Sequence, residues 1–166
     1  MLAPPVLASL VAYRSTTAAA GSSRSDSSTA DGSNPGLLPG AVEESLRLEP
    51  AAAVVDRYAT RDVSIGGAGI RRGDPVTVSL AGANRDPAVF PEPDRYDIGR
   101  PNSARHLAFA RGTHFCLGAH LARLEATAAV TALLDGLPGL ALDPGHPAAP
   151  DGLIFRKPAT LRVRWG

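Results

Sequence analysis

The chain has 166 residues, 44% of them apolar, which is enough for one domain with a hydrophobic core. Its 17 basic and 16 acidic side chains nearly cancel, so overall charge does not favour nucleic acid, an anionic membrane or an acidic substrate as a partner. A single cysteine excludes an internal disulfide framework and indicates a reducing compartment, for which we expect the cytoplasm.

The amino-terminal part predicts no packed structure. Residues 1–13 are mildly apolar but too short to span a bilayer, and they lack the basic start of a secretory signal. Residues 14–34 are rich in Ser, Thr, Ala and Gly and contain few side chains large enough to bury. We therefore expect residues 1–34 to be a flexible or disordered lead and residues 35–166 to form the folded unit.

The first predicted elements lie upstream of residue 105. Pro39 and Gly40 precede a short run of interleaved apolar and charged residues that ends at Pro50, which predicts one short helix. From residue 54 to residue 80, β-branched residues alternate with Gly and Pro, and this pattern predicts short strands joined by tight turns. Residues 81–105 are rich in Pro, Asp, Asn and Arg and have little periodicity, so we expect an irregular but packed stretch.

The carboxy-terminal part predicts a long helix followed by strands. Gly136 and Pro138 end the helical pattern in the order typical of a helix terminus. Beyond them, the apolar segment 153–155 and the alternating residues 161–165 predict two or three short closing strands. The helix itself is predicted from apolar residues at spacings near three and four, namely Leu117, Leu121, Leu124, Ala128 and Leu133.

The surroundings of the cysteine carry the clearest chemical signal. The sequence there reads HLAFARGTHFCLGAHLARLE, with Phe109, Gly112, Cys116 and Gly118 separated by two, three and one residues. This segment resembles the haem-binding signature of the cytochrome P450 family, and GAHLARLE resembles the start of that family's helix beneath the haem. The motifs EESLR, VDRYA, NRDP and PDRY resemble further landmarks of the family and occur in its order. The resemblance covers residues 35–166.

The resemblance implies that the Cys116 thiolate is the axial iron ligand of haem b. A thiolate donates electron density through iron and favours cleavage of a dioxygen bond on the opposite side, which a neutral thiol would not do. A position at the first turn of the following helix would direct the helix dipole and unpaired amides at the sulfur. Gly112 and Gly118 would let the backbone approach sulfur and porphyrin where a Cβ would collide, and Phe109 would pack near the porphyrin.

The resemblance also implies contacts to the two haem propionates. Arg57 and His114 match the family positions that bind them, and a guanidinium and an imidazole can both donate to a carboxylate. Without the family, both would be interpreted as ordinary surface residues. His106 matches the histidine of the family's HLAF context, and for it a propionate contact and a role in bracing the loop are both open.

A charged network is expected to support the cysteine. Glu44 and Arg47 are three residues apart on the first predicted helix, so their side chains can pair on one face. Taken alone, they could be an exposed ion pair worth about 0.3 to 0.5 kcal/mol. In the family, an arginine from the irregular stretch joins such a pair in a buried network that fixes the cysteine loop, and Arg95 matches its position. We therefore expect these three residues to be structural rather than catalytic.

Other roles for Cys116 fit its neighbours less well. A lone cysteine is often a small, buried apolar residue. His106, His114 and His120 beside Cys116 could form a zinc site, but the second cluster of ligands typical of such sites is missing. A cysteine nucleophile with His114 as its base is disfavoured because neighbouring loop residues rarely face one another.

The chain departs from the family at two places. Ala110 stands where the family most often has glycine, and an alanine there would cost on the order of 1 kcal/mol if the position has a positive φ. The family's long amino-terminal region and its distal helix have no counterpart in residues 1–34. We therefore expect a fragment with one haem face exposed, and exposed apolar surface that promotes association.

The expected fold class is α+β, as a carboxy-terminal fragment of the mainly helical cytochrome P450 fold. It would contain short helices, small β-sheets, an irregular meander, the cysteine loop and the proximal helix. The resemblance implies a haem-thiolate monooxygenase that oxygenates a small organic substrate with electrons from a ferredoxin or a flavoprotein reductase. The alternatives are a truncated, non-catalytic haem-binding remnant and a subunit completed by a separate amino-terminal half. We expect neither nucleic acid nor a membrane as a partner.

Overall fold

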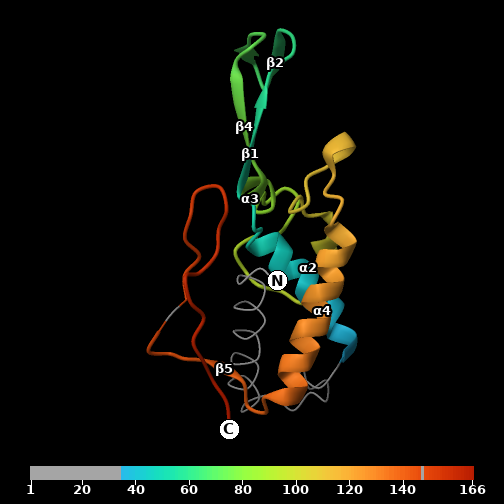
Figure 1. Ribbon diagram of the computed structural model, residues 1–166. Helices are drawn as coiled ribbons and strands as arrows, with labels where there is room; N and C mark the ends of the chain where they lie inside the picture. Colours follow the sequence, from blue (N-terminus) through green and yellow to red (C-terminus); the bar gives the residue numbers. More distant parts are fainter. Residues whose placement is uncertain (1–34, 147) are drawn as a thin grey trace.

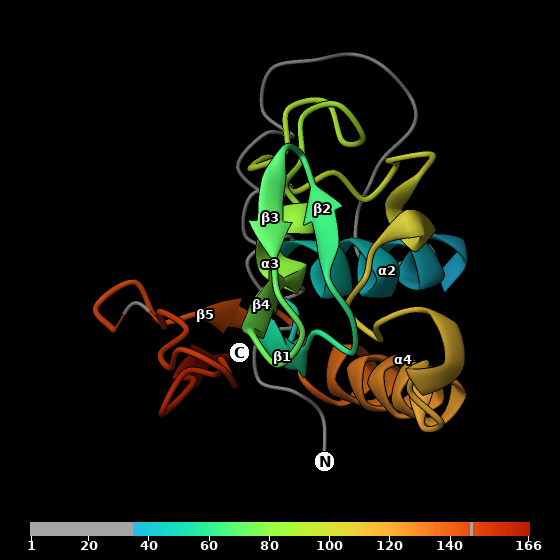
Figure 2. The ribbon, with the colours of Figure 1, turned by 90° about the horizontal axis from the view of Figure 1, so that it is seen from above.

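The structure is a computed structural model that describes residues 35–146 and 148–166. Two helices, α2 and α4, lie at its centre (Figure 1). The predicted lead, residues 1–34, lies outside the described residues. Helix α2 spans Leu38–Leu48 and α4 spans Ala119–Gly136, and the two lie side by side (Figure 1). Figure 2 shows the same arrangement from above. Between them lies the hydrophobic core, made of Ala41, Val42, Leu46, Ala126 and Val130.

Helix α2 begins and ends where the sequence predicts. The 3-10 turn η1, Pro35–Leu37, leads into it, and Pro39 lies in its first turn, where a helix needs no backbone donor. At its end, the Glu49 N–H donates to the Ser45 carbonyl at 3.0 Å, and Pro50 follows. The predicted short helix is confirmed.

Four short strands form an arm that projects from the helices (Figure 1). The first and fourth pair antiparallel, and the second and third form a hairpin farther out along the arm. Gly66 and Gly67 connect this hairpin with φ of +58° and +85°, which are typical of the two-residue turn that glycine adopts most readily. The strands are β1 Val54–Tyr58, β2 Val63–Ile65, β3 Ala68–Ile70 and β4 Pro75–Ser79.

The chain between this arm and α4 is largely irregular, as predicted. It starts with the single turn α3, Leu80–Ala83, which is capped by Ser79 because its Oγ accepts from the Gly82 N–H at 2.9 Å. Two 3-10 turns interrupt the remainder, η2 at Ser103–Arg105 and η3 at Gly112–His114. The stretch is nevertheless packed, since it contains the buried residues Asn84, Phe90, Arg100 and Ser103.

Helix α4 forms where the apolar spacing predicts it, but it packs by another face. Leu117 just before it is fully exposed, and Leu121 and Leu124 are 58% and 66% exposed. The buried residues are smaller, namely Ala119, Ala126 and Val130. Small side chains allow this helix to approach α2 closely, so the large leucines point away from the core.

The carboxy-terminal segment closes the fold with two short strands. Strand β5, Ala141–Leu142, pairs antiparallel with β6, Val163–Arg164, and an isolated bridge joins Ala52 to Phe155. Helices and small separate sheets together give the predicted α+β class. Among the described residues, we find no helix with both the length and the apolar character needed to cross a membrane.

Candidate functional site

The cysteine lies in a loop of residues 106–118, which we call the cysteine loop. Within it, the Ala110 N–H donates to the Leu107 carbonyl at 2.9 Å. The Cys116 N–H donates to the Phe109 carbonyl at 3.0 Å, so these two residues lie beside each other although they are seven apart. The loop is therefore closed by its own backbone immediately before α4.

Two residues in the left-handed region reverse the chain in this loop. Ala110 has φ of +59° and Gly112 has φ of +82°. Alanine in this region costs on the order of 1 kcal/mol, whereas glycine tolerates it. A Cβ added at Gly118 would lie 3.9 Å from the Cys116 Sγ, an ordinary contact, so the predicted collision with the sulfur is wrong. At position 112 the positive φ favours glycine, and no protein atom beyond its chain neighbours lies within 4 Å of a Cβ added there.

Cys116 is a free thiol at the surface. It precedes α4 by three residues, slightly earlier than predicted, and its carbonyl accepts from the Ala119 N–H at 3.2 Å. The amino-terminal end of α4, where the helix dipole is positive, thus lies next to the cysteine. Phe115 and Leu117 on either side are 49% and 100% exposed. An exposed thiol between exposed apolar side chains suits a large, flat, mainly apolar cofactor with a metal at its centre better than it suits a core cysteine.

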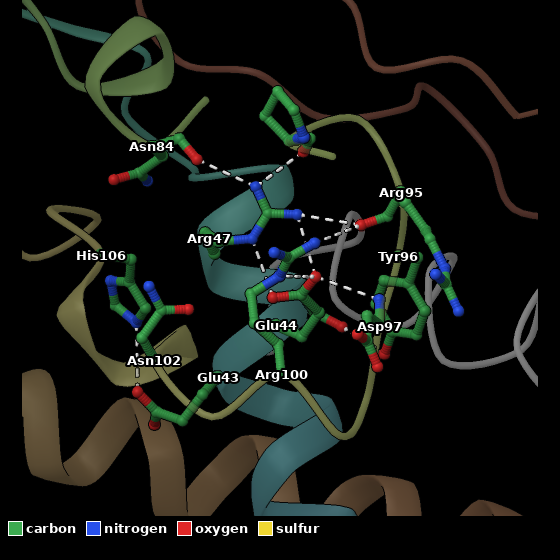
Figure 3. A network of polar contacts seen from close by, with 12 residues as sticks. Glu43, Glu44, Arg47, Asn84, Arg95, Tyr96, Asp97, Arg100, Asn102 and His106 are labelled. Carbon is green, nitrogen blue, oxygen red and sulfur yellow. Dashed lines mark hydrogen bonds and ion pairs between the residues drawn. The ribbon is translucent and has the colours of Figure 1, made fainter. Parts of the chain in front are cut away.

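A buried ion pair on α2 supports the structure behind this loop (Figure 3). Arg47 Nε and Nη2 donate to the two carboxylate oxygens of Glu44 at 2.8 and 2.9 Å, and both side chains are fully buried. The Asp97 N–H and Arg100 Nε each donate to Glu44 Oε1 at 3.0 Å. Burial alone would raise the pKa of Glu44, but the hydrogen bonds from Arg47, Arg100 and Asp97 outweigh it and lower that pKa.

Arg100 is the third member of this network, and the prediction for the side chain of Arg95 is wrong. The Arg95 side chain is 63% exposed and donates to Glu92 at 3.0 Å. Its carbonyl does take part, since it accepts from Arg47 and from Arg100 at 3.1 Å each. The path of the irregular backbone, and not the residue type, decides which arginine turns back towards α2.

The network reaches the cysteine loop through Asn84. Arg47 Nη1 donates to the Asn84 carbonyl at 2.9 Å, and the Asn84 Oδ1 accepts from the Leu107 N–H at 2.7 Å. Asn84 is fully buried. The ion pair and the loop are thus joined by one residue of the NRDP motif, through its carbonyl and its side chain.

His106 braces the start of the cysteine loop (Figure 3). Its side chain is 1% exposed, and its Nδ1 accepts from the Ala108 N–H at 3.1 Å. The proton therefore lies on Nε2, which donates to Glu43 Oε2 at 3.1 Å. Both ring nitrogens are thus engaged within the protein, which fits the bracing role of His106, and a contact of this residue to a propionate stays a prediction.

Glu43 and Arg123 are functional candidates that the sequence reasoning missed. The guanidinium of Arg123 donates to both carboxylate oxygens of Glu43 and lies 4.7 Å from the centre of the Phe109 ring. Burial would raise the pKa of Glu43, but hydrogen bonds from His106 and Arg123 lower it to about 2. The sequence offered one signal for Arg123. It follows Ala119 by four residues and therefore lies on the same face of the helix as that buried residue.

The remaining predicted haem contacts lie at the surface. Arg57 is exposed on β1 and donates to the Asp56 carbonyl at 2.8 Å, and His114 is exposed in η3. Their contacts to propionates stay predictions. In the part of the chain that the structure describes, no three His, Cys, Asp or Glu side chains gather as they would around a metal ion.

Comparisons with known proteins show which family this chain is similar to. A model of the family described as cytochrome P450 matches residues 18–137. The cytochrome P450 monooxygenase PikC of Streptomyces venezuelae is 48% identical over 132 residues, which are 78% of this chain and 32% of that protein. Mycinamicin IV hydroxylase/epoxidase of Micromonospora griseorubida is 45% identical over 138 residues, 79% of this chain and 34% of the relative.

Solved structures give the same result for the fold. The cytochrome P450 structure of CYP109Q5 from Chondromyces apiculatus matches with a TM-score of 0.81 and 36% identity, covering 98% of this chain and 39% of that chain. The chain thus spans about a third of the length of the relatives that it matches. The fold is that of the haem-thiolate monooxygenase family. The chain belongs to the cytochrome P450 family, of the bacterial type.

Proposed function

We propose that this chain binds haem b through the thiolate of Cys116 as part of a monooxygenase that inserts one oxygen atom into a small organic substrate. The observation that carries the proposal is the exposed thiol at the amino-terminal end of α4, in a loop closed by the hydrogen bond from Cys116 to Phe109. The haem, when bound, would supply the iron that activates dioxygen.

The residues of the chain would hold and shield this group. The Cys116 sulfur would carry its negative charge beside the positive end of the α4 dipole, which stabilises a thiolate. The Phe109 ring would exclude water from the sulfur, and the φ of Gly112 would keep the loop backbone in its reversed path. Arg57 and His114 would donate to the propionates, which need charged or polar donors.

The folded unit and its partners are part of this proposal. Residues 35–166 would form the haem-binding portion, and electrons would come from a ferredoxin or a flavoprotein reductase. The two relatives named above are a monooxygenase and a hydroxylase/epoxidase, which supports oxygen insertion as the reaction. The free thiol fits a reducing compartment, and we place the protein in the cytoplasm.

The proposal is tested by spectroscopy of the 166-residue chain with added haem. The reduced carbon monoxide complex of the wild type should show the strongly red-shifted Soret band of thiolate ligation, and Cys116→Ser should lose it. His120→Ala, which changes an exposed residue at the start of α4, is the control and should keep the band. Identical spectra of wild type and Cys116→Ser would disprove the assignment of the ligand.

A further inference from the structure

A second charged cluster lies between α2, α4 and the cysteine loop. Glu43 comes from α2, His106 from the loop and Arg123 from α4. Both oxygens of Glu43 are used, since Oε1 accepts from Arg123 and Oε2 accepts from Arg123 at 2.9 Å and from His106 at 3.1 Å. One carboxylate therefore ties three separate segments together.

The three side chains of this cluster are largely buried, so water screens their contacts only in part. The Glu43 side chain is 17% exposed, that of His106 is 1% exposed, and that of Arg123 is 30% exposed. Hydrogen bonds between charged groups are stronger than neutral ones, and partial burial reduces the screening by water. Glu43 also stays ionised over the working range of most proteins, because its pKa is lowered to about 2.

Phe109 connects this cluster to the cysteine. The Arg123 guanidinium covers the Phe109 ring at 4.7 Å, and the His106 ring lies 6.0 Å from it in a tilted arrangement. The Phe109 carbonyl, in turn, is the acceptor of the Cys116 N–H. Phe109 therefore contacts the cluster through its ring and Cys116 through its carbonyl.

We propose that Glu43 and Arg123 are positioning residues that hold Phe109, and through it Cys116, in the geometry that favours thiolate ligation of the haem iron. The inference rests on the proposed function and adds two residues to it. Arg123 fixes the ring from one side by a cation–π contact, and Glu43 fixes Arg123 by two hydrogen bonds. Neither residue would touch the reacting atoms.

The test compares two variants with matched surroundings. Glu43→Gln removes the charge that holds Arg123 and His106. Glu49→Gln removes a carboxylate of similar exposure, since the Glu49 side chain is 19% exposed and its partner Arg85 is 30% exposed. Glu49 also lies beyond the end of α2, and its ion pairs are with Arg85 and Arg156 rather than with the cysteine loop. A loss of stability alone should affect both variants.

The measured quantity is the ratio of the red-shifted to the shorter-wavelength Soret band in the reduced carbon monoxide complex. We expect this ratio to fall about tenfold in Glu43→Gln and to stay at the wild-type value in Glu49→Gln. Arg123→Lys keeps a positive charge but removes the planar group over Phe109, so its ratio should also fall.

The outcomes separate the two proposals. Equal ratios in Glu43→Gln and Glu49→Gln, or a wild-type ratio in Arg123→Lys, would overturn the positioning role while leaving the ligand assignment intact. Absence of the red-shifted band from the wild type itself would overturn the proposed function and this inference together.

Discussion

Several buried side chains of this protein form hydrogen bonds with backbone atoms of other segments. Arg47 donates to the carbonyls of Asn84, Pro93 and Arg95, and Asn84 accepts from the backbone of the cysteine loop. Arg100 similarly donates to three carbonyls of the irregular stretch. The guanidinium group suits this task because its five N–H donors point in fixed directions. These two arginines thus replace the hydrogen bonds that a regular element would make for itself.

Arg95 and Arg100 of the irregular stretch should differ strongly in their effect on stability. Arg100→Ala takes one donor from the buried Glu44 carboxylate and one donor from each of three carbonyls, so we expect a loss of about 3 to 5 kcal/mol. Arg95→Ala removes an exposed ion pair, and we expect less than about 1 kcal/mol. Urea unfolding of both variants measures the difference, and similar losses would contradict the assignment of Arg100 to the network.

Only part of the network around Glu44 could be predicted from the sequence. Glu44 and Arg47 can be paired from their spacing on a helix, because a helix fixes which side chains share a face. Arg95 and Arg100 are five residues apart in a stretch without periodicity, and nothing in the order of residues says which one turns inward. The same limit hid Glu43, whose partners lie 63 and 80 residues away in the chain.

At the level of elements, α4 has two unlike faces. The side towards α2 is lined by small residues such as Ala126 and by Arg123, whereas Leu121 and Leu124 lie on the exposed side. Periodicity predicts that a helix forms, but the spacing of the leucines does not reveal which side packs inside the chain. The helix and the short strands were predicted for different reasons, since glycines such as Gly66 and Gly67 directly indicate tight turns between strands.

Substitutions on the two faces of α4 should separate accordingly. Leu124→Gln changes a side chain that is 66% exposed, so the free energy of unfolding should change by less than about 0.5 kcal/mol. Val130→Ala creates a cavity in the core between α2 and α4 and should cost about 2 kcal/mol. Thermal or urea unfolding tests both values. A larger loss for Leu124→Gln than for Val130→Ala would show that α4 packs by the face that the leucines occupy.

At the scale of the whole molecule, two adjacent carboxylates connect α2 to distant segments of the chain. Glu43 and Glu44 are neighbours on α2, yet each belongs to its own cluster of cations. Hydrogen bonds overcome the effect of burial in both, so both pKa values lie below the ordinary value of 4.5. The fold class and the order of elements were predictable from the sequence, whereas this pairing depends on contacts between distant segments.

Stability should therefore fall in acid. Because the folded-state pKa of Glu43 is about 2, the unfolded chain binds its proton at a higher pH than the folded chain does. The stabilisation is fully present above pH 4.5 and is lost as the pH falls towards 2. Urea unfolding across this range should give a clearly smaller dependence on pH for Glu43→Gln than for the wild type. An equal dependence in both proteins would contradict the lowered pKa.

The carbonyl contacts of Arg47 and Arg100 have a practical consequence for protein engineering. A segment held by its main chain does not depend on the identity of its outward side chains, and Asp94 and Arg95 are 86% and 63% exposed. These positions are suitable for a fluorophore, an affinity tag or a designed charge. Such labels would lie on the irregular stretch and leave the backbone hydrogen bonds around Glu44 unchanged.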